Sequence, residues 1–324
     1  MSEWAAMSVD HGIRLPEELR GRVEDLLAGR VEAAPARDAA TVAVLRDHDE
    51  HGLQVFMLRR VASMAFAPGA YVFPGGSVDP RDGEASIGWA GPPPGEWARA
   101  FAAGETVARE LVCAAVRETF EETLVLLAGP APDAVVDDTR GDGWEADRRA
   151  LLDRSQSFAE FLGRRGLVLR SDLLRPWAHW ITPAVEPKRY DTRFFVAAIP
   201  EGQRARDVST EADRAVWVRP ADAVDHAMRG EWFVMPPTLA TLSELAACDT
   251  VADVLATERE IVAYEPRAEI IDGAAYLVLP TRPLGGGTTP HTPRAPSMRT
   301  SAGRPPARAP GHPPEATGHD TAQG

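Results

Sequence analysis

The sequence is poor in cysteine, lysine and long apolar runs. Its 324 residues include two cysteines, Cys113 and Cys248, too few for a disulfide framework. Lys188 is the only lysine, and arginine fills the other basic positions. The scarcity of cysteine predicts a reducing compartment, which we take to be the cytoplasm. No stretch approaches the roughly 18 consecutive apolar residues of a membrane-spanning helix, so we expect no membrane partner.

Basic residues are also outnumbered by acidic ones, which gives a net charge of −13. Broad nucleic-acid binding requires a basic face, so we expect no nucleic-acid partner. The negative charge does not exclude an anionic substrate, because a bound metal ion can reverse the local potential.

The most informative stretch is RETFEE at residues 117–122. On a helix, Glu118, Glu121 and Glu122 would share one face, where their like charges repel. Mg²⁺ or Mn²⁺ would offset this repulsion, because these hard cations prefer carboxylate oxygens. The alternative is a solvated acidic face that is paired with arginines.

Three more motifs accompany this stretch: FPGG at 73–76, WITP at 180–183 and RYDTRFF at 189–195. In this order they resemble the Nudix hydrolases, whose signature reads G-x5-E-x7-R-E-U-x-E-E-x-G-U, with U a bulky aliphatic residue. Gly76 precedes Arg117 by 41 positions instead of the family's 14, an excess of 27 residues. An interrupted signature of this kind resembles the peroxisomal coenzyme A diphosphatase branch. The likeness runs from about residue 38 to about residue 245.

The resemblance implies a Nudix α/β/α sandwich, an α/β fold with a mixed sheet between helices and a helical C-terminal extension. It also implies hydrolysis of a diphosphate linkage in a nucleoside diphosphate derivative, with coenzyme A or acyl-coenzyme A as candidate substrates. The implied ligands of Mg²⁺ or Mn²⁺ are Glu118, Glu121, Glu122 and the carbonyl of Gly76. Arg117 would orient one of these carboxylates by a charge-assisted hydrogen bond.

Other residues are candidates for substrate binding and proton transfer. Gly75 and Gly76 can bring backbone close to a phosphate, or can simply form a turn. Arg59 and Arg60 are candidate phosphate contacts, with a solvated strand end as the alternative. Glu211 lies before a late strand and is the candidate general base, with a surface acid as the alternative.

Two positions depart from the signature. Its middle acid has no settled counterpart: Asp82 lies six positions after Gly76 but before the extra residues, and Glu105 and Glu110 lie after them. Counting back from Arg117 reaches Arg109, so the choice stays open. Leu124 replaces the glycine after the acidic pair, and leucine resists a left-handed backbone, so we expect a different helix exit.

Aromatic residues of the late strands have two interpretations. They could stack on an adenine, although strand aromatics more often belong to the core. His179 is more often a structural histidine than a catalyst. The aromatic candidates are Trp177, Trp180, Tyr190 and Phe195.

The chain divides into an N-terminal helix and linker at 1–37, a Nudix domain at 38–280 and a disordered Pro/Gly-rich tail at 281–324. Residues 15–30 have the apolar spacing of an amphipathic helix. The domain should contain a hairpin over 41–60, the acidic helix over 105–123 and a helical extension at about 220–257. An insertion at about 77–104 should form a loop-rich surface excursion.

A second function class remains open. Nudix-like proteins with weak catalysis can act as nucleotide-metabolite sensors that regulate a partner. The intact carboxylate trio favours an enzyme over such a sensor, and a homodimer is compatible with the sequence.

Overall fold

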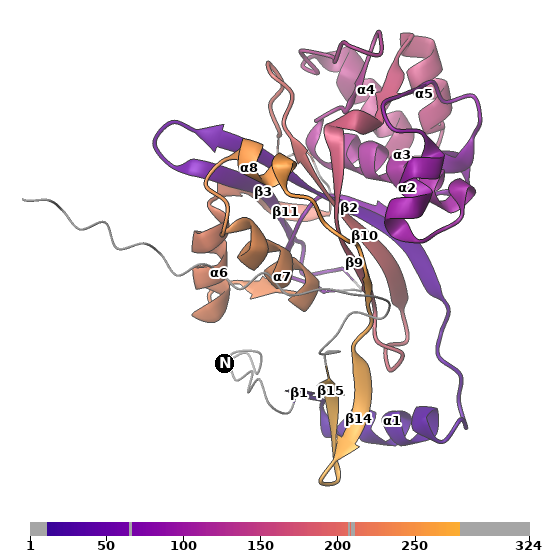
Figure 1. Cartoon of the computed structure of the whole chain (residues 1–324), viewed down its shortest axis with the longest axis vertical. Coiled ribbons are helices and arrows are strands. Elements are labelled where there is room, and N and C mark those ends of the chain that lie inside the picture. Colours follow the sequence, from indigo (N-terminus) through magenta and orange to yellow (C-terminus); the bar gives the residue numbers. More distant parts are fainter. Residues whose placement is uncertain (1–11, 65–66, 207, 209–210, 279–324) are drawn as a thin grey trace, which may run out of the picture. The chain divides into compact units, whose positions relative to one another are not determined.

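A mixed β-sheet lies at the centre of the computed structural model, which describes residues 12–64, 67–206, 208 and 211–278 (Figure 1). The strand order is β12-β4-β3-β2-β10-β9-β13, with β11 paired to β3 and β5 paired to β2. Strand β2 pairs in parallel with β10 and antiparallel with β3, so the sheet is mixed. Its strands are β2 (Ala36–His48), β3 (Gly52–Arg60), β4 (Ala70–Val72), β5 (Gly75–Ser77), β9 (Leu174–Ile181), β10 (Arg189–Ala198), β11 (Ala212–Val218), β12 (Phe233–Val234) and β13 (Ala263–Tyr264).

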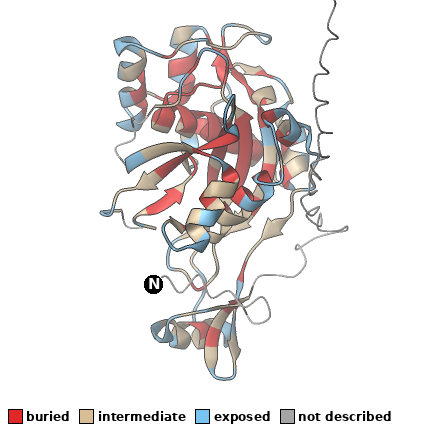
Figure 2. Ribbon diagram, turned by 90° about the vertical axis from the view of Figure 1, so that its left-hand side faces the viewer, coloured by how far each residue is buried: buried red, intermediate tan, exposed pale blue. Residues whose placement is uncertain are grey.

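Helices cover both faces of this sheet. Val42 and Val44 of β2 belong to one buried cluster, and Ala43 and Leu45 belong to a second, as the two-residue period of a strand requires. Figure 2 shows these buried residues along the sheet and the facing helices. The predicted α/β/α sandwich is therefore confirmed. The first cluster contains residues of α2 (Pro94–Phe101), α3 (Glu105–Thr123), α4 (Asp142–Leu152) and α5 (Phe158–Arg165), and the second those of α6 (Pro220–Met228), α7 (Pro236–Leu245) and α8 (Val251–Ala256).

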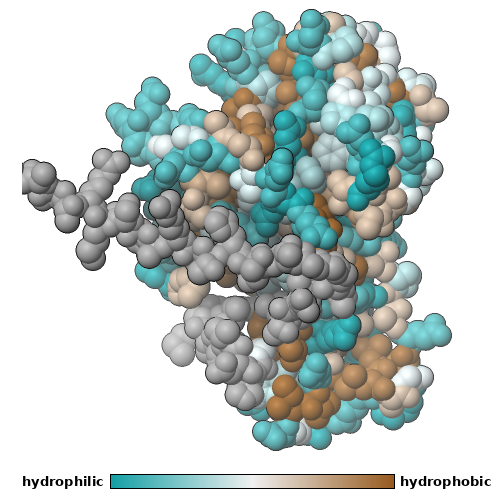
Figure 3. Space-filling view, viewed as in Figure 1, coloured by the Kyte–Doolittle hydropathy of each residue, from teal (hydrophilic) through white to brown (hydrophobic). Residues whose placement is uncertain are grey.

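The two ends of the described chain form a smaller unit, which we call the accessory module. Its strand order is β1-β15-β14, and α1 packs against β14 and β15 through a separate small core. The helix is shorter than the 15–30 expected from the sequence, because a 3₁₀ turn, η2, precedes it. Figure 3 shows apolar residues at the module's surface, where Leu27 is 61% exposed. The module comprises β1 (Ile13–Arg14), η2 (Glu17–Leu19), α1 (Arg20–Leu27), β14 (Arg267–Ile271) and β15 (Ala274–Val278).

Local sequence patterns predicted several elements correctly. The acidic helix spans the expected residues, Glu105–Thr123, and β2 and β3 form the expected hairpin. Within the described residues, no helix is both long and apolar enough to cross a membrane. The tail at 281–324 lies outside the described residues.

The residues between the FPGG turn and α3 are not the surface excursion that the sequence suggested. Trp97 and Phe101 of α2 are buried, and their rings lie 5.7 and 5.3 Å from that of Phe195 on β10. The segment also forms η3 (Pro80–Gly83) and β6 (Trp89–Ala90), and β6 pairs with β8 (Val168–Arg170), as does β7 (Ala128–Gly129). A further 3₁₀ turn, η4 (Ser171–Leu173), follows β8. Apolar side chains in a Gly- and Pro-rich segment thus contribute to the core.

The exit of α3 also differs from expectation. Leu124 adopts the left-handed conformation, with φ 62°, where the signature has glycine. Its side chain is fully buried, and its backbone carbonyl accepts a hydrogen bond from Thr139 Oγ1 at 2.7 Å. Burying a leucine contributes about 1.5–3 kcal/mol, which offsets the roughly 1–2 kcal/mol cost of this backbone conformation.

We therefore expect Leu124→Ala and Leu124→Gly both to lower the free energy of unfolding, by about 2–5 kcal/mol for alanine. The glycine variant should be the more stable of the two by about 1 kcal/mol, because glycine alone relieves the backbone strain. Urea unfolding of the two variants and the wild type measures both differences. An alanine variant more stable than the glycine variant would contradict this explanation.

Candidate active site

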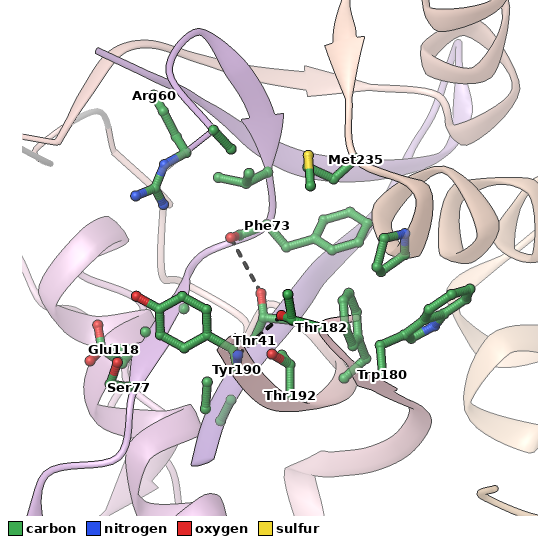
Figure 4. Close-up of a pocket in the computed structure, with 18 of the residues that line it drawn as sticks. Thr41, Arg60, Phe73, Ser77, Glu118, Trp180, Thr182, Tyr190, Thr192 and Met235 are labelled. Carbon is green, nitrogen blue, oxygen red and sulfur yellow. Dashed lines mark hydrogen bonds between the residues drawn. The ribbon is translucent and has the colours of Figure 1, made fainter. Parts of the chain in front are cut away.

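The acidic residues of α3 line a cavity of about 880 Å³. Glu118, Glu121 and Glu122 all contribute to its lining, as do Gly75 and Gly76 of the FPGG turn. In Figure 4, Glu118 lies at one end of the cavity, and Trp180 and Met235 lie at the other. The cavity therefore has a carboxylate end and an aromatic and apolar end.

The FPGG turn fits closely between β2 and α3. The amide of Gly75 donates a hydrogen bond to Glu122 Oε2 at 3.0 Å. A Cβ atom on Gly76 would lie 2.5 Å from Glu118 Oε1, closer than real Cβ atoms come. Only glycine leaves this space beside the Glu118 carboxylate. These contacts confirm that the turn and the acidic helix adjoin despite the extra residues between them.

Arg117 connects the carboxylates of α3 to the FPGG turn and to η3. Its Nη1 donates to Glu118 Oε1 at 2.8 Å and to Glu121 Oε1 at 3.2 Å. Its Nε and Nη2 donate to the two carboxylate oxygens of Asp82 at 2.9 and 3.0 Å, and Nη2 also reaches the Ser77 carbonyl. This forked pairing fixes the plane of the guanidinium.

Asp82 is the site residue whose role the sequence analysis left open. It is only 1% exposed and accepts the paired hydrogen bonds of Arg117. Its place six positions after Gly76 is that of the signature's middle acid. Glu110 instead lies against Gly83, and Glu105 lies against Gly95. The spacing from Gly76 therefore indicated Asp82 correctly. Counting back from Arg117 reached Arg109 instead, because the extra residues lie between Asp82 and Arg117.

The carboxylate end holds excess negative charge. Burial and the neighbouring Glu118 raise the pKa of Glu121 to about 7. The pKa of Glu118 and that of Glu122 are also raised, in both cases chiefly by burial. Glu211 contributes to both of these increases, so it too lies near the trio. Arg117 alone does not compensate this number of acids.

The donor set fits a divalent cation. Carboxylate and carbonyl oxygens are the ligands that Mg²⁺ and Mn²⁺ prefer, and a cation would stabilise the charged form of these acids. Among the described residues, no three acidic, histidine or cysteine side chains already enclose a metal position. Glu118 and Glu121 are turned toward Arg117, so binding requires these two side chains to rotate.

The raised pKa of Glu121 predicts a pH effect in the metal-free protein. The pKa of Glu121 is raised from the ordinary glutamate value of 4.5 to about 7, so the folded state binds more protons than the unfolded state between these two pH values. Stability should therefore fall as pH rises through this window. Glutamine cannot titrate, so Glu121→Gln should gain melting temperature relative to the wild type from about pH 5 to about pH 8 in chelator. A difference that stays constant over this range would contradict the assignment.

The other candidate site residues separate into two groups. Arg60 and Glu211 line the cavity, and Arg60 lowers the pKa of Glu122. Arg59 does not line it and instead pairs with Asp213 at 2.7 and 3.0 Å. Successive strand side chains point to opposite faces, so only one of the two arginines faces the cavity. The position of Arg59 therefore does not support the prediction that it contacts a phosphate.

The aromatic candidates divide in the same way. Trp180 and Tyr190 line the cavity, whereas Trp177 and Phe195 are buried in the two core clusters. His179 is buried and hydrogen-bonds to Asp191, in keeping with a structural role. No sequence pattern indicated the apolar end of the cavity, because its residues come from separate elements. They include Phe73, Phe194, Phe233, Met235, Pro236 and Pro237.

Comparisons with known proteins agree with this fold. A family model described as the NUDT19 Nudix domain matches residues 96–245. The crystal structure of a NUDIX hydrolase from Alicyclobacillus acidocaldarius has a TM-score of 0.60 and 29% sequence identity, and covers 70% of this chain and 98% of that chain. In both sequence and fold the chain is similar to the Nudix hydrolase superfamily.

Within that superfamily the chain is similar to the coenzyme A diphosphatase-like branch. It is 27% identical over 245 residues to the acyl-coenzyme A diphosphatase NUDT19 of Gallus gallus, covering 62% of this chain and 63% of that protein. It is 28% identical over 193 residues to the putative nudix hydrolase 7 of Caenorhabditis elegans, covering 60% of this chain and 56% of that protein. The chain therefore spans less than two thirds of the length of these relatives.

Proposed function

We propose that this protein hydrolyses the diphosphate linkage of a nucleoside diphosphate derivative. The observation that supports this most is the carboxylate end of the cavity, where Glu118, Glu121 and Glu122 of one helix adjoin Glu211 and the FPGG turn. Such a cluster repels a diphosphate unless a cation is bound. The proposal therefore includes Mg²⁺ or Mn²⁺.

Each residue has a distinct role in this proposal. Glu118, Glu121, Glu122 and the Gly76 carbonyl would hold the cation, which when bound neutralises phosphate charge and acidifies water. Arg117 keeps the helix carboxylates in place through its hydrogen bonds.

Two further side chains would act on the substrate. Arg60 would bind a phosphate oxygen, and Glu211 would accept the proton of the attacking water. The new bond joins the water oxygen to one phosphorus, and the bridging phosphorus–oxygen bond breaks. Two phosphate-terminated products result.

Coenzyme A or an acyl-coenzyme A is the substrate that we propose to test first. Two relatives with this activity in their names, from Gallus gallus and Homo sapiens, are each 27% identical to this chain. The aromatic and apolar end of the cavity offers a surface for the apolar part of such a molecule. The products would be 3′,5′-ADP and a 4′-phosphopantetheine.

A nucleotide-metabolite sensor is the alternative. Such a protein would bind the same compounds without turning them over, and the retained carboxylate trio favours catalysis over this reading. That the protein is located in the cytoplasm and that it forms a homodimer are still predictions from the sequence.

The decisive experiment is a substrate panel. Purified protein is incubated with coenzyme A, acyl-coenzyme A, NADH, ADP-ribose and a sugar nucleotide, each with Mg²⁺, Mn²⁺ or chelator. We expect metal-dependent release of two phosphate-terminated products, greatest for the coenzyme A compounds. Binding without turnover in every metal condition would favour the sensor instead.

A further inference from the structure

The connection between β9 and β10 forms part of the cavity wall. Thr182, Pro183, Glu186 and Lys188 of this connection all line the cavity. They lie beside Tyr190, the second residue of β10, whose amide donates to Thr182 Oγ1 at 3.0 Å. This hydrogen bond closes the connection at its base. In Figure 4, Thr182 and Tyr190 are adjacent at the cavity.

The accessory module holds this connection in place. Val185, at its centre, is fully buried in the small core that also contains Val23 and Leu277. Arg22 Nε donates to the Val185 carbonyl at 2.6 Å. A buried apolar anchor and a backbone hydrogen bond restrict the connection, so the side chains on its cavity side have defined positions.

Lys188 is the cation that this connection brings to the cavity. Its Nζ lies 5.5 Å from the centre of the Tyr190 ring, within the range of a cation–π contact. Among the described residues it has no carboxylate within ion-pair distance, Glu186 included. By contrast, Arg81 and Arg117, which also line the cavity, are paired with Asp79 and Asp82.

Lys188 comes from the connection between β9 and β10, whereas the carboxylate end is built from α3 and the FPGG turn. The cations that act most on Glu118, Glu121 and Glu122 are Arg117 and Arg60. A cation in the same cavity but outside this cluster is available to a second anionic group of the ligand. The ammonium group is a compact charge with three donors, which suits a terminal phosphate.

We propose that Lys188, positioned by the accessory module, binds a phosphomonoester that the substrate carries apart from its diphosphate. This inference rests on the proposed diphosphate hydrolysis and narrows its substrate class. It selects compounds with a third phosphate on the ribose, such as coenzyme A, over matched compounds without one, such as dephospho-coenzyme A.

The test compares these two compounds in Lys188→Met and Lys188→Arg. A hydrogen bond between charged groups predicts that Lys188→Met lowers the ratio of kcat/KM for coenzyme A to that for dephospho-coenzyme A by about ten- to a hundredfold. Lys188→Arg should keep most of this ratio. Arg99→Met, an exposed charge on α2 away from the cavity, is the control for net charge. An unchanged ratio in Lys188→Met would overturn the inference.

Binding provides a readout that does not depend on turnover. Calorimetry with 3′,5′-ADP and 5′-AMP should show tighter binding of the bisphosphate by the wild type and loss of this preference in Lys188→Met. If the wild type hydrolyses none of the diphosphates, the proposed function fails, and the binding preference alone then decides the role of Lys188. Equal affinity of the wild type for both nucleotides would reject that role.

The chain's single lysine permits a second test. Acetylation of amines neutralises only Lys188 among the side chains, and Lys188→Arg removes that target. Acetylation should abolish the preference for 3′,5′-ADP in the wild type and leave it in Lys188→Arg. Val185→Ala tests the positioning role, because loosening the connection should weaken the same preference. Retention of the preference after complete acetylation of the wild type would contradict the inference.

Discussion

Glu122→Gln should lower turnover of the diphosphate substrate at least about a hundredfold while the fold is retained. Glu122 has the amide of Gly75 as a hydrogen-bond partner, and a glutamine carbonyl can accept the same bond. The substitution therefore removes charge from the cation site with little change in shape. Steady-state kinetics at saturating metal measure the loss.

Thermal melting separates this effect from unfolding. Burial and Glu118 raise the pKa of Glu122 well above its usual value, so the neutral variant should melt no lower than the wild type in chelator. Mg²⁺ should raise the melting temperature of the wild type more than that of the variant. The matched control is Glu105→Gln, the same change at an exposed position of the same helix. Wild-type turnover in Glu122→Gln would show that the trio is not the cation site.

The acidic helix and the hairpin were predictable because local patterns determine them. The run from Glu105 to Thr123 has the composition of a helix, and its three glutamates share a face in any helical geometry. Two β-like runs on either side of a polar turn likewise predicted the hairpin of β2 and β3. The order of the four motifs then indicated the sandwich fold through its resemblance to the Nudix hydrolases.

Contacts between distant segments were not predictable in the same way. Helix α4, which begins at Asp142, was not among the elements expected from the sequence, and α2 lies in a segment expected to be a surface loop. Both helices have their apolar residues buried against other elements, so tertiary packing outweighs weak local preference. Leu124 shows the same principle at one residue, because burial of its side chain offsets the cost of its left-handed backbone conformation.

Which strand-end arginine enters the cavity also depends on context. Arg59 and Arg60 are adjacent in sequence, and either could have faced the carboxylates. In the structure Arg59 pairs with Asp213 on the neighbouring strand β11, and Arg60 lines the cavity. A single sequence does not reveal the register between β3 and β11, so this assignment required the structure.

The inserted residues matter to the site because Asp82 precedes them and Arg117 follows them. Asp82→Asn should both destabilise the protein and lower turnover. Asp82 is 1% exposed and the Arg117 side chain 11%, so neutralising the acid leaves a buried cation with one partner fewer. Breaking such a pair costs about 3–5 kcal/mol. Urea unfolding measures this loss.

The effect on turnover follows from the remaining partners of Arg117. Without the Asp82 charge, the guanidinium should bind Glu118 and Glu121 more strongly, and these are the carboxylates that must turn toward a cation. Metal affinity should therefore fall about ten- to a hundredfold, seen as a higher metal concentration for half-maximal activity. Asp82→Glu, which restores the acid of the family signature, should recover most of that affinity. Asp79→Asn is the control in the same 3₁₀ turn, because asparagine can still cap it. If Asp82→Asn needed no more metal than the wild type, Arg117 would not hold Glu118 and Glu121 in competition with the cation, and its role would be limited to stabilising the fold.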